Sequence, residues 1–317
     1  MRTKGTAEQA FRRGRSYHEQ GDYGWAIFAY TEAVWLKPDW AEAYFVRGDA
    51  YRRMGDLDKA IADLTEAIRL KPDYAGAYCV RAAAYLRTGE TDKAIGDYTE
   101  AIRLKPDWAE AYNIRGDVCV SKGEMDRAIC DFTEAIRLKP DYAEAYYNRG
   151  DVYVGKGDLD KAIADYNIAI RPKPDHAGAY YIRGAVYASK GEMDRAICDF
   201  TEAIRLKPDH AEAYYKRGAV YVSKGEMDRA IADYTEAIRL KPDDAEAYCN
   251  RGAVYASKGD LDKAILQAGR RLSQQGRPGQ GDCRLQHSYP AQAGLRRSVL
   301  QPGPCLSQQG RQKQSRR

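Results

Sequence analysis

AEAYYKRGAVYVSKGEMDRAIADYTEAIRLKPDD, residues 211–244, is the stretch that decides the fold of this chain of 317 residues. Close variants of these 34 residues follow one another without a gap from residue 7 onward. The units begin at Ala7, Ala41, Ala75, Ala109, Ala143, Ala177, Ala211 and Ala245. Residues 121–141 and 189–209 are identical, which indicates recent internal duplication. A strict period of this length predicts a stack of supersecondary units, whereas length alone would suggest about two ordinary domains.

Each unit carries two helical patterns separated by a glycine. In the fifth unit, small and aromatic residues recur at helical spacing in the first pattern, from Ala143 to Tyr153, and again in the second, from Ala162 to Ile170. We predict that Asp141 caps the first helix, with Glu144 completing a capping box. Gly157 should end that helix, and Asp158 or Asp160 should cap the next one. Lys173-Pro174 should end the second helix, because proline cannot continue a helix interior.

The spacing Tyr-x3-Gly-x2-Tyr-x8-Ala-x3-Tyr/Phe-x2-Ala-x4-Pro resembles the tetratricopeptide repeat. In the third unit these positions are Tyr78, Ala82, Tyr85, Ala94, Tyr98, Ala101 and Pro106, with Ala82 in place of the usual glycine. The resemblance covers about residues 7–265. It implies an all-α fold, a right-handed α-solenoid of about eight tandem helix-turn-helix repeats, with the last one incomplete. One hairpin cannot bury its apolar stripe alone, so each must pack on its neighbours.

An arginine precedes the glycine position in each of the seven units from the second to the eighth, where many repeats of the family carry leucine. These residues are Arg47, Arg81, Arg115, Arg149, Arg183, Arg217 and Arg251. Sixteen residues after each of the first six stands an aspartate: Asp63, Asp97, Asp131, Asp165, Asp199 and Asp233. We predict Arg–Asp pairs within or between hairpins. The alternative is that both positions are solvated and each aspartate faces the Lys or Arg four residues before it.

Composition gives little support for nucleic acid, membrane or disulfide chemistry. The formal charge is +5, but residues 266–317 carry +9, which leaves −4 for residues 1–265. No run of about 18 apolar residues predicts a membrane span, and the first 20 residues contain no secretory signal. The seven cysteines are odd in number and lie mostly inside repeats. We therefore expect reduced thiols in a cytoplasmic protein.

Residues 266–317 form a basic tail rich in Gln, Gly and Arg, which composition predicts to be disordered. LSQQGR nevertheless occurs at residues 272–277 and 306–311, again 34 residues apart. Codons can be chosen for residues 282–310 that, read one nucleotide later, spell TADYNTAIRLKPDYAEAYYNRGRAYLSKG. We hypothesise that this tail is an out-of-frame translation of further repeats. The eighth repeat would then end uncapped, with an apolar patch near Tyr248, Tyr255 and Ile265 that promotes self-association.

The resemblance implies a concave face built from the second, fifth, sixth and ninth positions of each first helix, and the last three vary most between units. We predict a peptide-binding site from the following residues: Asn113, Asp117, Tyr147, Asn148, Asp151, Tyr181, Tyr215, Lys216 and Asn250. The three tyrosines occupy the same position in consecutive units and offer rigid contact area. Asp49, Asp117 and Asp151 should favour a basic segment. Core packing of the tyrosines, and drift at exposed sites, are the alternatives.

The sequence contains no motif that indicates an enzyme. His18, His176, His210 and His287 form no metal-binding pattern, and no glycine-rich phosphate loop is present. We therefore predict no catalytic residue, no metal and no cofactor, and a non-enzymatic scaffold that binds a protein or peptide ligand. One alternative is the repeat portion of a larger enzyme or signalling protein truncated by the frameshift. The other is an RNA-binding helical repeat protein, which the strict period and the acidic face disfavour.

Overall fold

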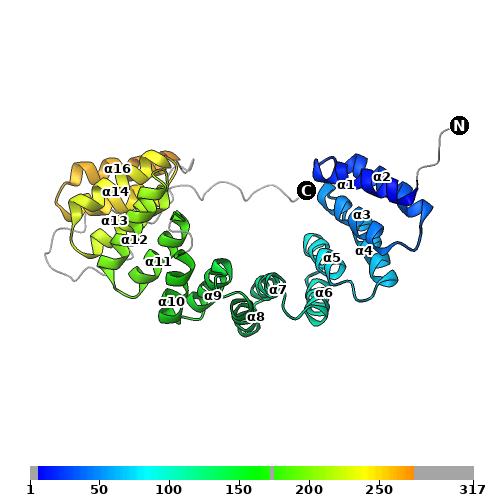
Figure 1. Ribbon diagram of the computed structural model, residues 1–317. Coiled ribbons are helices and arrows are strands. Elements are labelled where there is room, and N and C mark those ends of the chain that lie inside the picture. Colours follow the sequence, from blue (N-terminus) through cyan, green and yellow to red (C-terminus); the bar gives the residue numbers. More distant parts are fainter. Residues whose placement is uncertain (1–5, 172–174, 275–317) are drawn as a thin grey trace, which may run out of the picture.

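The computed structural model describes residues 6–171 and 175–274. Within these ranges the chain forms sixteen α-helices and no strand, arranged as eight hairpins along an arc (Figure 1). The first helices are α1 (Ala7–Glu19), α3 (Ala41–Met54), α5 (Ala75–Thr88), α7 (Ala109–Ser121), α9 (Ala143–Gly155), α11 (Ala177–Ser189), α13 (Ala211–Ser223) and α15 (Ala245–Ser257). The second helices are α2 (Tyr23–Leu36), α4 (Leu57–Leu70), α6 (Thr91–Leu104), α8 (Met125–Leu138), α10 (Leu159–Ile170), α12 (Met193–Leu206), α14 (Met227–Leu240) and α16 (Leu261–Gln274). The predicted α-solenoid is confirmed.

The helix ends agree only in part with the sequence prediction. Gly157 ends the first helix of its hairpin as predicted, with φ at +79°, a conformation that favours glycine. The capping prediction was wrong, because helical geometry starts one residue later than expected and Tyr142, not Asp141, occupies the N-cap of α9. Asp158 occupies the N-cap of α10 as predicted, although neither Tyr142 nor Asp158 makes a side-chain capping bond. Asp158 instead pairs with Lys161 at 2.6 Å.

The core lies between the two helices of each hairpin and continues into the next one. Each second helix packs on its own first helix and on the first helix that follows. Aromatic residues such as Tyr98, Phe132 and Tyr166 are fully buried there. Glycine allows the close approach: a Cβ at Gly116 would stand 2.6 Å from the Phe132 ring. The residues of each repeat are therefore determined by packing between helices as well as by the requirements of helix formation.

The predicted Arg–Asp pairs form in all six repeats, and each pair joins the two helices of one hairpin. In every pair Nε and Nη2 donate to the two carboxylate oxygens at 2.6–2.8 Å. Nη1 of the same arginine donates to the preceding hairpin, as from Arg115 to Thr99 at 3.1 Å. Asn167 takes over this acceptor role for Arg183 at 2.8 Å. In the eighth hairpin Arg251 donates to Gln267 and Thr235. Each of these arginine side chains therefore forms hydrogen bonds both within its own hairpin and to the preceding hairpin.

At the C-terminal end, α16 continues beyond Ile265, where the sequence placed the end of the array. Ile265 is 58% exposed, whereas its equivalent Ile95 is 7% exposed because the following hairpin covers it. The predicted apolar patch is thus present at Ile265, but the prediction was wrong for Tyr248, which is buried beside Ile238 and Ala247. Residues 275–317, and with them the hypothesis of a shifted frame, lie outside the described residues. No helix within the described ranges is long and apolar enough to span a membrane.

Candidate functional site

The first helices face the inside of the arc and the second helices face the outside, most clearly for α5 to α10 (Figure 1). Successive first helices also contact one another, as α7 does with α9 and α11 with α13. The inner side is therefore a continuous surface made by side chains from one helix of each hairpin. This arrangement agrees with the concave face that the repeat pattern implied.

The three tyrosines of the predicted site are half-buried, and each packs on an aromatic residue of its own second helix. The ring centroids lie 5.8 Å apart for Tyr147 and Tyr166 and 5.9 Å apart for Tyr181 and Phe200. Tyr215 lies 5.7 Å from Tyr234 in the same way. Burial raises the pKa of Tyr147 to about 12. Each tyrosine therefore serves the hairpin core with part of its surface and leaves the rest available.

Two of the predicted asparagines bond to the preceding hairpin. Asn148 Nδ2 donates to Asn113 Oδ1 at 3.3 Å and to Asp117 Oδ1 at 2.9 Å. Asn250 Nδ2 donates to the Tyr215 hydroxyl at 2.8 Å. Asn113 is only 1% exposed, so it supports the surface from below and cannot itself touch a ligand. The placement of Asn113 in the binding face was wrong, because Asn148 covers it.

Asp117 and Asp151, here called the acidic pair, are exposed and lie on adjacent first helices. The pKa of Asp117 is raised to about 6. The main cause is that neighbouring groups remove part of the water around its carboxylate, and the negative charges of Glu144 and Asp151 add to the rise. Partial burial also raises the pKa of Asp151, although the Tyr166 hydroxyl donates to it at 2.5 Å and opposes that rise. The shift in the pKa of Asp117 includes repulsion by two neighbouring carboxylates, which a cation would relieve, whereas the shift in the pKa of Asp151 comes from burial.

Asp49 behaves differently from the acidic pair. Burial would raise its pKa, but hydrogen bonds from Arg53 and Arg52 bring that pKa below its ordinary value. The distances are 2.8 Å from Arg53 Nε and 2.6 Å from Arg52 Nη2. Its charge is thus already balanced within α3, and the expectation that Asp49 attracts a basic segment was wrong for this reason.

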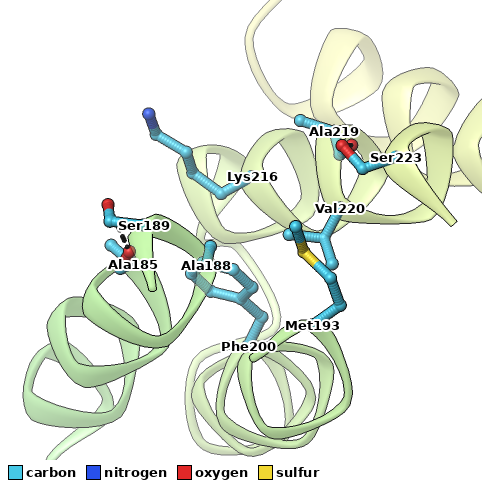
Figure 2. A pocket seen from close by; sticks show the side chains of 9 residues that line it. All are labelled: Ala185, Ala188, Ser189, Met193, Phe200, Lys216, Ala219, Val220 and Ser223. Carbon is cyan, nitrogen blue, oxygen red and sulfur yellow. Dashed lines mark hydrogen bonds between the residues drawn. The ribbon is translucent and has the colours of Figure 1, made fainter. Parts of the chain in front are cut away.

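A cavity of about 290 Å³ opens between α11 and α13, above α12 (Figure 2). The lining residues are Ala185, Ala188, Ser189, Met193, Phe200, Lys216, Ala219, Val220 and Ser223. Two alanines at the ninth position of neighbouring first helices, Ala185 and Ala219, leave the space open. Met193 and Phe200 form an apolar floor, and exposed Lys216 extends at the rim. Of the predicted site residues, only Lys216 lines this cavity.

Most of the residues that line the cavity were not predicted from the sequence. The predicted site residues occupy the fifth, sixth and ninth positions of first helices, whereas Ser189 and Ser223 stand at the thirteenth position and Met193 belongs to a second helix. The available signal was small size at the ninth position, where Ala185 and Ala219 replace the aspartates of earlier repeats. His210 packs against Tyr181, with ring centroids 4.9 Å apart. No group of three or more potential ligand side chains that could hold a metal occurs in the described part of the chain.

A stack of hairpins with an inner face of this kind defines a helical repeat protein. Family models described as TPR repeat match residues 14–55, 48–89, 116–157 and 220–259, and further tetratricopeptide repeat models match residues 75–108 and 147–211. The chain belongs to the tetratricopeptide repeat family, whose members are typically scaffolds for protein interactions. A comparison with curated proteins gives no match.

Several solved structures are similar. The MamA protein is 32% identical, with a TM-score of 0.51, over 53% of this chain and 92% of its own. YrrB, described as a TPR protein with an unusual peptide-binding site, is 26% identical, with a TM-score of 0.51, over 56% of this chain and 92% of its own. The C-terminal part of a TPR repeat-containing protein from Cytophaga hutchinsonii has a TM-score of 0.66 at 20% identity, over 74% of this chain and 96% of its own. That last likeness shows the fold alone.

Proposed function

We propose that this protein is a non-enzymatic scaffold that binds an extended peptide, or an extended segment of a partner protein, along the inside of the arc. The observation that carries the proposal is the cavity between α11 and α13, with its apolar floor and the exposed Lys216 at its rim. A volume of about 290 Å³ is at the lower limit of small-molecule pockets, so it suits one side chain of a longer ligand.

The chemistry of the surface indicates what such a ligand contains. An apolar side chain fills the space above Met193 and Phe200. An acidic side chain or a terminal carboxylate faces Lys216, and a lysine or arginine faces the acidic pair. The exposed parts of Tyr147 and Tyr181 lie between these points along the array and offer rigid contact area. YrrB, which shares the fold, is described as having a peptide-binding site, and this similarity adds support.

The proposal can be tested with the full chain and a series of fluorescein-labelled nine-residue peptides, each with a central leucine and either acidic or basic flanks. Fluorescence anisotropy should show binding that weakens with salt. Ala219→Gln fills the cavity and should weaken binding more than about tenfold, and Lys216→Glu should weaken binding of acidic-flanked peptides by about tenfold. Arg205→Ala, on the outside of α12, is the matched control and should bind normally. Normal binding by Ala219→Gln would contradict the proposed site.

A further inference from the structure

The outer face of the first hairpin differs from that of every other hairpin. On α2, Trp25, Phe28 and Trp35 are 62%, 66% and 73% exposed, and we call these three residues the aromatic stripe. They lie opposite the helix face that buries Tyr30, so neither the hairpin core nor the next hairpin covers them. Figure 1 shows α2 at the N-terminal end of the arc. Large apolar side chains gathered on one face are characteristic of interaction surfaces.

The internal repeats provide a direct comparison for this face. Trp25 corresponds to Lys59, Lys93, Arg127, Lys161, Arg195, Arg229 and Lys263. Trp35 corresponds to Arg69, Arg103, Arg137, Arg171, Arg205 and Arg239. Phe28 corresponds to alanine, glycine or cysteine in six repeats and to leucine in the eighth. The other outer faces are thus charged and solvated, with pairs such as Arg69 and Glu66 at 2.7 Å. The other repeats form the same hairpin without aromatic residues at these three positions, although Trp25 also lies beside Tyr17 of α1, with ring centroids 6.2 Å apart.

Trp25 and Trp35 stand five residues on either side of residue 30, whereas Glu32 occupies the position that mirrors Phe28. Two copies of α2 packed antiparallel would place Trp25 of each copy opposite Trp35 of the other. Glu32 would then lie opposite Phe28, and its charge is already balanced by Arg13 at 2.6 Å. The same face can therefore serve both partners of a two-fold pair.

A second feature stands at one end of the stripe. A depression of about 380 Å³ is lined by Gly21, Asp22, Tyr23, Gly24, Trp25 and Met54. In the antiparallel arrangement, Trp35 of the second copy reaches the Trp25 end of α2, where this depression can receive its ring. Since the stripe points away from the hairpin core, the remainder of each copy lies behind its own α2 and does not obstruct the approach.

We propose that the aromatic stripe is a self-association surface through which two copies of this chain pair by antiparallel contact of their α2 helices. Aromatic side chains of this exposure contribute about 300–500 Å² per copy, or about 600–1,000 Å² in all. Stable interfaces bury about 1,200–2,000 Å². The pair is therefore a reversible dimer whose population depends on concentration. The surface is separate from the inner face, so the dimer and the peptide site are tested independently.

The first experiment is analytical ultracentrifugation of the full chain across a concentration series. The triple variant Trp25→Lys, Phe28→Ala and Trp35→Arg gives α2 the residues that the other repeats carry, so its fold should be retained, as circular dichroism would show. We expect the dimer dissociation constant to rise more than tenfold. Arg205→Ala, on the exposed side of α12, is the matched control, and Ile265→Glu tests the C-terminal apolar patch as the rival surface; both should leave the dimer unchanged. A dimer abolished by Ile265→Glu and kept by the triple variant would overturn the proposal.

The second experiment tests the antiparallel register. Trp25→Lys and Trp35→Glu should each weaken the dimer alone, whereas their mixture should form a heterodimer with one Lys–Glu contact and one intact Trp–Trp contact. A parallel pair would place like positions opposite each other and would give no such rescue, so absence of rescue refutes the register. A protein that stays monomeric but binds phosphatidylcholine–phosphatidylserine vesicles through the stripe would refute the second copy as its occupant.

Discussion

Removal of the Asp131 carboxylate should expose the energetic role of the arginine–aspartate pairs. Asp131 is 4% exposed and accepts two hydrogen bonds from Arg115, at 2.8 and 2.6 Å. In Asp131→Ala the guanidinium loses both bonds and its opposite charge while it stays largely enclosed. Breaking a buried ion pair from one side costs about 3–5 kcal/mol. Arg115 keeps its bond to Thr99 and its position over the Tyr112 ring, so we expect a loss of about 2–4 kcal/mol.

The assay must resolve single hairpins, because repeat arrays do not unfold as one two-state unit. Urea unfolding followed by circular dichroism gives the overall loss of stability. Hydrogen exchange of the amides in α7 and α8 shows whether that loss is confined to this hairpin. Glu134→Ala is the matched control, since Glu134 lies on the same helix and pairs with Arg137 on the exposed side. Its stability should equal that of the unaltered protein within error. Equal stability of Asp131→Ala and Glu134→Ala would refute the reasoning that burial makes this pair essential.

Three further outcomes follow from the packing and the charges. Gly116→Ala should cost about 1–3 kcal/mol in urea unfolding, since its Cβ would meet Phe132 at 2.6 Å, and an unchanged midpoint would show that the ring moves freely. Asn167→Thr should be neutral and Asn167→Ala should lose about 0.5–1.5 kcal/mol, because only threonine keeps the acceptor for Arg183; equal losses would contradict this. Asp117, with its pKa near 6 in the folded protein against an ordinary 3.8, is neutral at pH 5 and charged at pH 7. A basic-flanked peptide should therefore bind more tightly as pH rises from 5 to 7, and Asp117→Asn should flatten that anisotropy profile; an unchanged profile in the variant would exclude Asp117 as the titrating group.

Much of the fold follows from the period of 34 residues, because every strong signal is repeated six to eight times in phase. The hairpin glycine and the arginine–aspartate pairs were predictable on this basis, since paired positions sixteen residues apart recur together. The N-cap at Tyr142 was not predictable, because the residue at which helical geometry begins depends on how the loop packs against the previous hairpin. The threonine acceptors were not predicted, although each also stands sixteen residues from its arginine, because threonine carries no charge that would mark it as a partner of arginine.

The inner face was predictable as a set of positions but not as a surface. Variation between repeats indicated Lys216 and the acidic pair, whose side chains are exposed in the structure. It could not show that Asn113 is covered by Asn148 of the next hairpin, or that Arg52 and Arg53 balance Asp49. The cavity depends on Ser189, Ser223 and small alanines of two neighbouring first helices, so it can be recognised only when those helices are placed side by side. The exposure of each side chain on the inner face therefore depends on the neighbouring hairpins and cannot be derived from one repeat alone.

The direction of the arginine bonds bears on how the chain folds during its synthesis. Each arginine bonds to an aspartate in its own hairpin and to a residue of the hairpin made before it, as Arg115 does with Asp131 and Thr99. The lysine that ends a first helix follows the same rule, as Lys122 pairs with Asp92 of the previous repeat at 2.8 Å. Domains generally fold from the N-terminus as the chain leaves the ribosome. Every polar link of this kind can therefore close as soon as a hairpin emerges, without waiting for residues not yet translated.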